Sequence, residues 1–146
     1  MIDQSLPATS GVDHVGLSVS NLDSTREFFC DCLGWRVVGE RPDYPAIFVS
    51  DDRTVVTLWQ VESPDRAVAF DRRANVGLHH LALAVADRPG LDAVYQRVSQ
   101  WPGVDIEFAP QLSGKGPKVH FIVREPSGVR IEFAYDPRLE EVRARR

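Results

Sequence analysis

The stretch that decides the fold is Gly77–Val85, which reads GLHHLALAV. In it Leu81, Leu83 and Val85 alternate with His80 and two alanines. A period of two sends successive side chains to opposite faces, so the pattern predicts a β-strand. The apolar side of this strand should pack on a helix. His80 is then left on a face otherwise lined by alanine, like the floor of a cavity.

The same phrase occurs near the N-terminus, at His14–Val19, which reads HVGLSV. It matches HLALAV at 80–85 position for position, with the histidine in the same register and only small residues behind it. The two copies lie about half the chain apart, which predicts an internal duplication. Each module should therefore offer one histidine to the same kind of surface.

Around the first phrase, the pattern predicts one helix and three further strands. Asn21, Asp23 and Ser24 are candidate caps for the helix, Ser24 and Glu27 have capping-box spacing, and Gly34 ends the helix. The expected strands of this first module are Val12–Val19, Trp35–Arg41, Ala46–Ser50 and Thr54–Val61.

The second module should repeat this order after a charged connection at 62–76. Asp87 precedes an expected helix at about 89–101, EPSG at 125–128 is a strong turn signal, and Pro110–Pro117 reads as a flexible insert. Its expected strands are Gly77–Val85, Val104–Phe108, Lys118–Arg124 and Val129–Tyr135. The fold class is therefore α+β. Two tandem βαβββ modules (about 12–61 and 77–136 of one domain, 1–146) should form a curved, eight-stranded open barrel around a cavity, with the helices outside.

Composition excludes several classes of protein. The chain has 146 residues, 43% of them hydrophobic and 26% charged, which is typical of one soluble globular domain. The net charge of −4 argues against a nucleic-acid or anionic-membrane surface. The chain shows no apolar run of about 20 residues and no signal-peptide layout, so we expect a cytoplasmic protein without a membrane partner. Cys30 and Cys32 lie about 200° apart on a helix, so they cannot share a metal there, and Cys32 reads as core.

A carboxylate on the last strand completes a candidate metal site. Ile131 and Phe133 alternate with Glu132, which puts Glu132 on the face where both histidines point. A buried carboxylate is costly without a partner. Two histidines and one carboxylate suit Fe, Mn, Ni, Co or Zn as a divalent ion, with positions left for substrate. In the alternative reading, the histidines are hydrogen-bonded interior residues and Glu132 pairs with Arg130 or Lys118.

Further side chains should face the same hollow. Alternation places His120 and Lys118 there, and His120 could act as a general acid/base or as a hydrogen-bond donor to substrate, or simply bond backbone or water at a strand edge. Trp59 shares a face with Thr57 and could wall the substrate pocket or merely fill the barrel. Arg130 could bind an anionic substrate group or pair with a nearby acid.

These motifs together resemble the vicinal oxygen chelate superfamily. The likeness rests on the doubled βαβββ order, the repeated H-x-x-L-x-V strands and the closing EPSGVRIEF, and spans roughly 12–136. The superfamily contains glyoxalases, bleomycin- and fosfomycin-resistance proteins, methylmalonyl-CoA epimerases and extradiol dioxygenases. Its metal ligands map to His14, Thr57, His80 and Glu132, and three of these four fit the pattern.

Thr57 departs from the lactoylglutathione lyases, in which this position is a glutamate that binds the metal and moves a proton. The His-His-Glu set is closer to extradiol dioxygenases and fosfomycin thiol transferases. The dioxygenases, however, carry a tyrosine at the position of Ile122 and a histidine in the preceding loop. The fosfomycin enzymes carry a threonine at the position of Gly16. They also carry a potassium-binding loop that contains serine, and Ser113 is only weakly similar to that feature.

The resemblance implies an enzyme, a lyase, isomerase or dioxygenase, with one divalent ion held by His14, His80 and Glu132. Glu132 and His120 would be its catalytic residues. The small substrate would chelate the metal through neighbouring oxygens, and the protein would be a homodimer. One alternative is a non-catalytic drug- or metabolite-binding resistance protein, and another is a thiol transferase acting on a phosphonate antibiotic. The sequence leaves open whether His14 meets His80 within one chain or across two.

Overall fold

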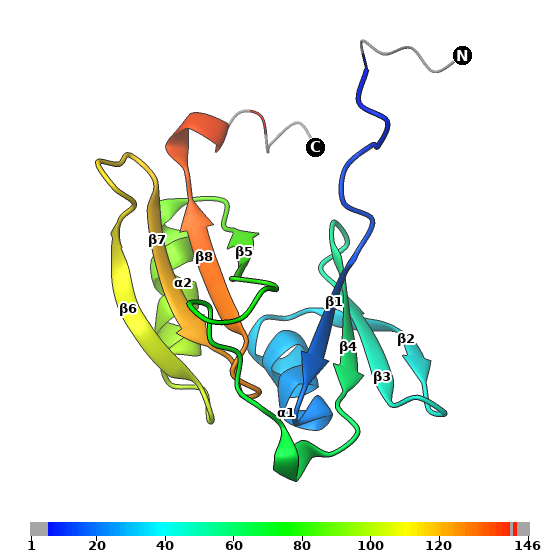
Figure 1. Cartoon of the computed structure of the whole chain (residues 1–146). Helices are drawn as coiled ribbons and strands as arrows, with labels where there is room; N and C mark the ends of the chain where they lie inside the picture. The colour runs from blue at the N-terminus through cyan, green and yellow to red at the C-terminus, as the bar shows by residue number, and fades with distance from the viewer. Residues whose placement is uncertain (1–5, 141, 143–146) are drawn as a thin grey trace.

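The computed structural model describes residues 6–140 and 142, and within them the chain forms two modules of the same design (Figure 1). Each runs strand, helix and three strands, which confirms the tandem βαβββ order of an α+β fold. The first module comprises β1 (Val15–Val19), α1 (Leu22–Glu27), a π-helical turn (Phe28–Cys32), β2 (Arg36–Arg41), β3 (Ala46–Ser50) and β4 (Val55–Gln60). The second comprises β5 (Leu81–Ala84), α2 (Arg88–Val98), β6 (Asp105–Leu112), β7 (Val119–Arg124) and β8 (Arg130–Tyr135).

Each module makes its own four-stranded sheet, with the orders β1-β4-β3-β2 and β5-β8-β7-β6. The first strand of each module is parallel to the last, and the other pairs are antiparallel. Gly16 pairs with Thr57 in the first sheet, and Ala82 pairs with Glu132 in the second. The duplication read from the sequence thus extends to strand register, and it makes Thr57 the structural counterpart of Glu132.

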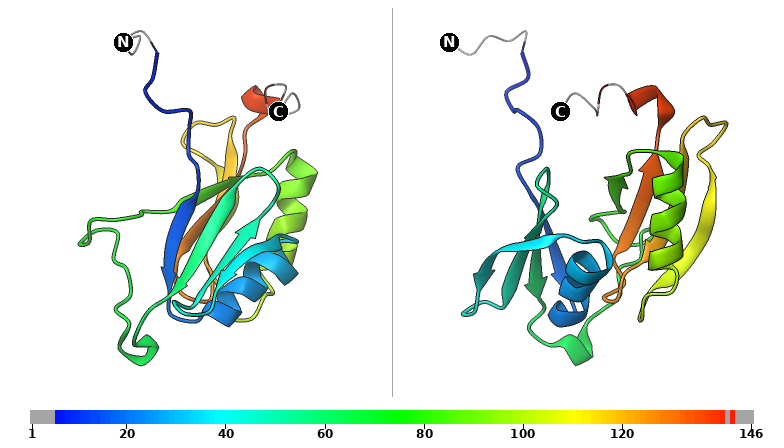
Figure 2. Two further views of the ribbon diagram at one scale, coloured as in Figure 1. Left: turned by 90° about the vertical axis from the view of Figure 1, so that its right-hand side faces the viewer. Right: turned by 180° about the vertical axis from the view of Figure 1, so that it is seen from behind.

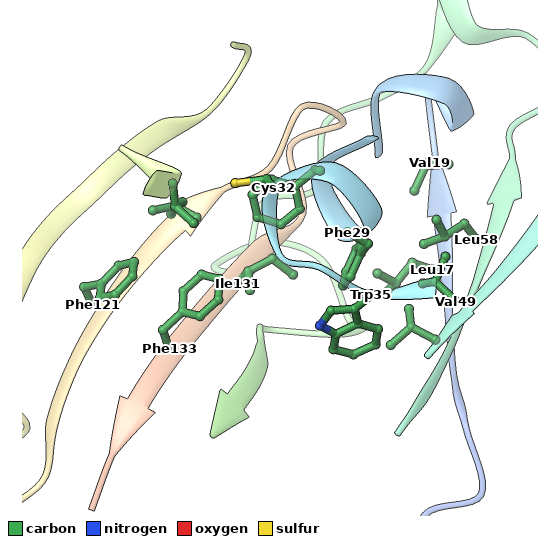
Figure 3. Packing of buried hydrophobic residues seen from close by; sticks show 14 of the residues in the cluster. Leu17, Val19, Phe29, Cys32, Trp35, Val49, Leu58, Phe121, Ile131 and Phe133 are labelled. Atoms are coloured by element: carbon green, nitrogen blue, oxygen red, sulfur yellow. The ribbon is translucent and has the colours of Figure 1, made fainter. Parts of the chain in front are cut away.

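One hydrophobic core joins the two sheets and is built on the helices (Figure 3). Phe29 and Cys32 from the π-helical turn are fully buried there, so Cys32 is a core residue as predicted. Leu17 reaches this core from the first sheet, and Ile131 and Phe133 reach it from the second. Full burial of such a side chain stabilises the fold by about 1.5–3 kcal/mol. This shared core therefore fixes how the two sheets face one another.

The shared core occupies one side of each sheet. Seen from behind, α1 lies between the two sheets and α2 lies in front of β7 and β8 (Figure 2). The apolar side of each sheet is committed to the helices, so the side that carries the predicted site residues opens outward. Within the described part of one chain, the eight strands form two separate sheets and do not close into a barrel.

The first strand of each module begins later than its sequence pattern suggested. β1 begins at Val15 and β5 at Leu81, where pairing starts with the parallel partner strand; Leu81 pairs with Ile131. The residues before these points have no partner in the ladder. His14 and His80 therefore each lie immediately before a strand, at equivalent places in the two modules.

The flexible insert predicted at 110–117 is wrong in its first part, because β6 runs through Pro110 to Leu112. β6 is an edge strand of the second sheet, where proline is tolerated because one side of the ladder needs no N–H donor. Register shifts between Ile106 and Phe108, and between Phe108 and Gln111, interrupt its pairing with β7. Such bulges change which face a side chain occupies, and the sequence pattern does not show them.

The helix ends follow local side-chain chemistry. The Asn21 side chain caps α1 by accepting from the Ser24 backbone N–H at 3.1 Å, so Ser24 is inside the helix and its predicted capping box with Glu27 is wrong. Asp87 caps α2 as predicted, by accepting from the Gly90 N–H at 2.6 Å. Among the described residues, neither helix has the length and apolar content that a membrane span requires.

Candidate metal centre

Glu132 lies at the centre of the candidate site, on β8 in the interior of the second sheet, and is only 5% exposed. Its Oε2 lies 3.0 Å from Nε2 of His80, and its Oε1 lies 2.6 Å from Nδ1 of His120. Nζ of Lys118 lies 3.5 Å from the same Oε1. The structure thus brings together four of the residues that alternation placed on one face of the second module.

The surroundings of Glu132 keep its carboxylate ionised. Burial is the largest influence and acts to raise the pKa of Glu132. The hydrogen bond from His120 and the charges of Lys118, His120 and His80 together outweigh burial, so the pKa lies below its ordinary value. Glu132 is therefore an anion near neutral pH, which is the form that binds a cation.

His14 does not join this cluster. It lies before β1 in the other sheet, its side chain is 51% exposed, and its Nδ1 contacts Oδ2 of Asp13 at 2.6 Å. Across residues 6–140 and 142, no group of three or more histidine, cysteine, aspartate or glutamate side chains is arranged to hold a metal ion. One chain alone therefore does not assemble the His14, His80 and Glu132 set.

On the open face of the first sheet, Thr57 takes the place that Glu132 has in the second. Its hydroxyl accepts a hydrogen bond from Nε1 of Trp59 at 2.9 Å and donates to the Val15 carbonyl at 3.5 Å. The Trp59 ring packs against the rings of Tyr44 and Phe48. The surroundings of Thr57 on this face are therefore aromatic, and the pocket-wall role of Trp59 stays a prediction.

The guanidinium group of Arg130 binds a carboxylate of the same chain and is not open to a ligand. Its Nε and Nη2 each donate to Glu107 at 2.8 Å, and only 8% of the residue is exposed. Arg124 and Arg72 also lie near the same carboxylate, at 3.4 and 3.8 Å. The hydrogen bond from Arg130 is the main reason why the pKa of Glu107 is lowered. Of the two readings of Arg130, pairing with a nearby acid is the one this geometry matches.

Sequence reasoning missed His79, which touches both Arg130 and His80. Nη1 of Arg130 lies 3.1 Å from Nδ1 of His79 and donates to the His79 carbonyl at 3.0 Å. Nδ1 of His79 lies 2.7 Å from Nδ1 of His80. Desolvation, followed by the charges of Arg130 and His80, lowers the pKa of His79. The signal for His79 in the sequence is the His79-His80 doublet.

A separate cleft of about 350 Å³ lies on the other side of the second sheet, between the modules. Trp35 and Arg36 line it from the first module, and Leu83 and Val85 line it from the second. Ser50, Asp51 and Asp52 add polar groups to its wall, and Glu132 is not among the residues that line it. The hollow is thus distinct from the candidate metal centre.

Comparison with known proteins places this geometry in a family. The family model described as "Glyoxalase/Bleomycin resistance protein/Dioxygenase superfamily" matches residues 11–133. A 2-epi-5-epi-valiolone epimerase of Actinomyces sp. is 26% identical over 136 residues, covering 80% of this chain and 73% of the epimerase. A catechol-2,3-dioxygenase of Bacillus subtilis (strain 168) is 28% identical over 88 residues, covering 58% of this chain but only 30% of the dioxygenase.

Solved structures share the fold across most of the chain. Lactoylglutathione lyase from Agrobacterium tumefaciens is 20% identical with a TM-score of 0.67, over 88% of this chain and 96% of that one. A glyoxalase-related enzyme from Fulvimarina pelagi is 22% identical with a TM-score of 0.69, over 88% and 90%. The paired modules, the buried Glu132 and the match over residues 11–133 agree with one another. The chain belongs to the glyoxalase/bleomycin resistance protein/dioxygenase superfamily.

Proposed function

We propose that this protein is a divalent-metal-dependent enzyme whose active site is completed across a homodimer. In this proposal His80 and Glu132 of one protomer and His14 of the partner protomer hold the ion. The substrate is a small molecule that presents two neighbouring oxygens. The observation that carries the proposal is Glu132 itself, a buried carboxylate with two imidazoles and one ammonium group directed at it.

The residues present fit such an ion. Imidazole nitrogen and carboxylate oxygen are the donors that Fe, Mn, Ni, Co and Zn accept in sites with open positions. Nε2 of His80 and Oε2 of Glu132 are 3.0 Å apart, a separation suited to two donors on one ion. Ala82 and Ala84 share their face of β5 and are exposed, so no large side chain of that strand covers the pair.

The arrangement of the sheets supports the dimer. Each open face lies on the side of its sheet that is turned away from the shared core. We therefore infer that His14 approaches Glu132 when the first sheet of one protomer covers the second sheet of another. A two-fold interface of this kind is self-complementary and forms two equal sites. Apolar residues beside both histidines are open to such a partner: Val12 is 79% exposed and Leu78 is 44% exposed.

The chemistry that best suits this site is proton transfer next to a carbonyl group. When bound, a divalent ion acts as a Lewis acid that stabilises negative charge on a substrate oxygen. His120 already shares a proton with Glu132 through their 2.6 Å contact and is the base nearest the site. Thr57 and Trp59 of the partner would form the opposite wall, where a hydroxyl takes the place of a second carboxylate.

Between proton transfer and dioxygenation, the comparisons favour proton transfer. The epimerase match covers 80% of this chain, whereas the dioxygenase match covers 58%. We therefore place an isomerase or lyase first and a dioxygenase second. The two are separated by incubating the metal-loaded protein with small hydroxyketones in D₂O and with catechols under oxygen. Deuterium incorporation beside the carbonyl, followed by NMR, supports the first, and oxygen uptake supports the second.

The cytoplasm is the location we propose. Cys30 and Cys32 are both free thiols, and burial raises the pKa of each. Unpaired thiols, of which Cys32 is buried and Cys30 partly buried, suit a reducing compartment. A pair of fractionation assays, one for a periplasmic marker and one for a cytosolic marker, tests this location directly.

Metal binding is the direct test of the proposed function. Protein purified without chelator is analysed for metal content and titrated calorimetrically with Ni(II), Mn(II), Zn(II) and anaerobic Fe(II). Glu132→Gln keeps the shape and removes the charge, so its affinity should fall by about 100-fold or more, and that of Thr57→Ala by much less. Glu125→Gln, the same change at a buried site elsewhere, is the matched control.

Two results would overturn the metal-dependent function. Either the wild type binds none of these ions, or Glu132→Gln binds them as tightly as the wild type does. In both cases the non-catalytic binding of a drug or metabolite becomes the better account of the open faces.

A further inference from the structure

The contact between Arg130 and His79 fixes where one proton can be. Nη1 of Arg130 lies 3.1 Å from Nδ1 of His79, in hydrogen-bonding geometry. A guanidinium group has only donors, so Nδ1 of His79 must be the acceptor. An acceptor nitrogen of an imidazole carries no hydrogen. His79 in this arrangement is therefore the tautomer protonated on Nε2.

The neighbouring contact then assigns the proton on His80. Nδ1 of His79 and Nδ1 of His80 are 2.7 Å apart, which requires one hydrogen between them. Since His79 has none on that atom, the hydrogen belongs to Nδ1 of His80, and the single lone pair on Nδ1 of His79 is shared between Arg130 and His80. The lone pair of a neutral His80 ring is then on Nε2, 3.0 Å from Oε2 of Glu132. Both of these atoms are acceptors, so a cation held between them would satisfy both.

We infer that His79 is a positioning residue that holds His80 in the Nδ1–H tautomer and directs its Nε2 at the metal position beside Glu132. This inference rests on the proposed metal-binding function. An imidazole in the other tautomer would present an N–H to the ion and could not coordinate through that atom. Hydrogen bonds from the second nitrogen of a ligating histidine commonly set its tautomer in this way.

The support behind His79 is rigid. Arg130 is nearly buried and donates two hydrogen bonds of 2.8 Å to Glu107. Its Nη1 takes no part in these two bonds and points towards His79. The same Nη1 also donates to the His79 carbonyl, so backbone and ring are both held. This role explains why a buried arginine lies close to the site without being open to a ligand.

Two substitutions of His79 separate a positioning role from simple space filling. His79→Asn supplies a side-chain oxygen near the position of Nδ1, with two lone pairs to accept from Arg130 and His80. His79→Leu has similar bulk and no acceptor. Arg124→Gln is the matched control, since it removes a charge near Glu107 without touching His79.

The first readout is the tautomer itself, in metal-free protein at about pH 8.5, where a histidine of ordinary pKa is neutral. Multiple-bond ¹H–¹⁵N NMR of the imidazoles should show His80 protonated on Nδ1 in the wild type, in His79→Asn and in Arg124→Gln. In His79→Leu the signals should change to those of a mixture or of the Nε2–H form. A wild-type His80 protonated on Nε2, or a pattern unchanged in His79→Leu, overturns the inference.

The second readout is metal affinity by calorimetry with Zn(II) and Ni(II). His79→Leu should bind about 10–100-fold more weakly than the wild type, with most of the loss restored in His79→Asn. Equal affinity in His79→Leu, with a changed tautomer, would overturn the role of His79 in metal binding. If the wild type binds no ion at all, the proposed function fails, and the NMR result still decides whether His79 sets the His80 tautomer.

Discussion

The hydroxyl of Thr25 in α1 donates a hydrogen bond of 2.7 Å to Oε2 of Glu125, and this contact joins the two modules. Glu125 is 1% exposed, and its Oε1 also accepts from the backbone N–H groups of Ser127 and Val129. The turn that leads into β8, and therefore towards Glu132, is thus anchored to the first helix. The relative orientation of the two sheets depends in part on this buried cluster.

Removal of the Thr25 hydroxyl should destabilise the whole fold. Thr25→Val keeps the volume but leaves one carboxylate oxygen of Glu125 without its donor. We expect the free energy of unfolding to fall by about 1–3 kcal/mol, measured by urea denaturation. Thr25→Ser retains the hydroxyl and should lose less. Equal losses in the two variants would show that the methyl group, and not the hydrogen bond, matters at this position.

The stability of the protein should respond to pH through Glu125. Burial raises its pKa above the unfolded value, although the hydrogen bonds from Thr25, Ser127 and Val129 oppose this shift. A raised pKa gives a contribution to stability that is complete below about pH 4.3 and is lost as the pH rises through the folded value. The stability of Glu125→Gln relative to the wild type should therefore increase between about pH 4 and pH 7.

Comparing Glu125→Gln with the wild type isolates the contribution of Glu125 to the pH dependence of stability. Glu132 and Glu107 have lowered pKa values, so their contributions run in the opposite direction and are lost as the pH falls. These contributions are present in both proteins and cancel in the difference. A stability difference that stays constant with pH would contradict the assignment to Glu125.

The helix cap offers a second test of local structure. Asn21→Ala removes the side-chain acceptor for the first turn of α1 and should lower the free energy of unfolding by about 0.5–2 kcal/mol. Ser24→Ala should have little effect, because Ser24 is a helical residue and not the cap. Thermal or urea unfolding of the two variants gives the comparison. A larger loss for Ser24→Ala would favour the capping box predicted from the sequence.

Mixing two variants that each lack one proposed metal ligand should show whether the metal site is shared between two chains. His14→Ala and Glu132→Gln homodimers should each bind metal poorly. If each site uses His14 of one chain and Glu132 of the other, a mixed dimer has one site with both defects and one with none. An equimolar mixture, unfolded and refolded together, should regain about a quarter of the wild-type sites at random assembly. No recovery would indicate that each site lies within one chain, or that no dimer forms.

The alternation of apolar and polar residues along the strands accounts for most of the structure that could be predicted from the sequence. It set the face of Glu132 and His120, and the repeated histidine phrase revealed the duplication. The equivalence of Thr57 to a ligand position came from the resemblance to the superfamily. Alternation could not show how the two sheets lie relative to each other, because that depends on the core around Phe29 and Cys32. The sequence pattern assigns both open faces to one cavity, whereas in the chain they belong to two separate sheets.

Other parts of the site were beyond any periodic pattern. Glu107 lies on a strand with two bulges, so its approach to Arg130 depends on irregular pairing. His79 precedes β5, where no ladder constrains the side chain, and its role depends on an arginine far away in the sequence. Contacts of this kind arise from tertiary structure and need coordinates to be found.

The register that makes Thr57 the counterpart of Glu132 also sets the electrical balance of the proposed site. A divalent ion held by one carboxylate and neutral imidazoles keeps one positive charge, whereas a second glutamate would cancel it. Lys118, 3.5 Å from Glu132, adds to the excess. Such a site attracts a ligand that brings one negative charge and favours loss of a proton from a neutral one. In the proposed site, a hydroxyl in place of a second carboxylate would therefore favour chelators that bind as monoanions.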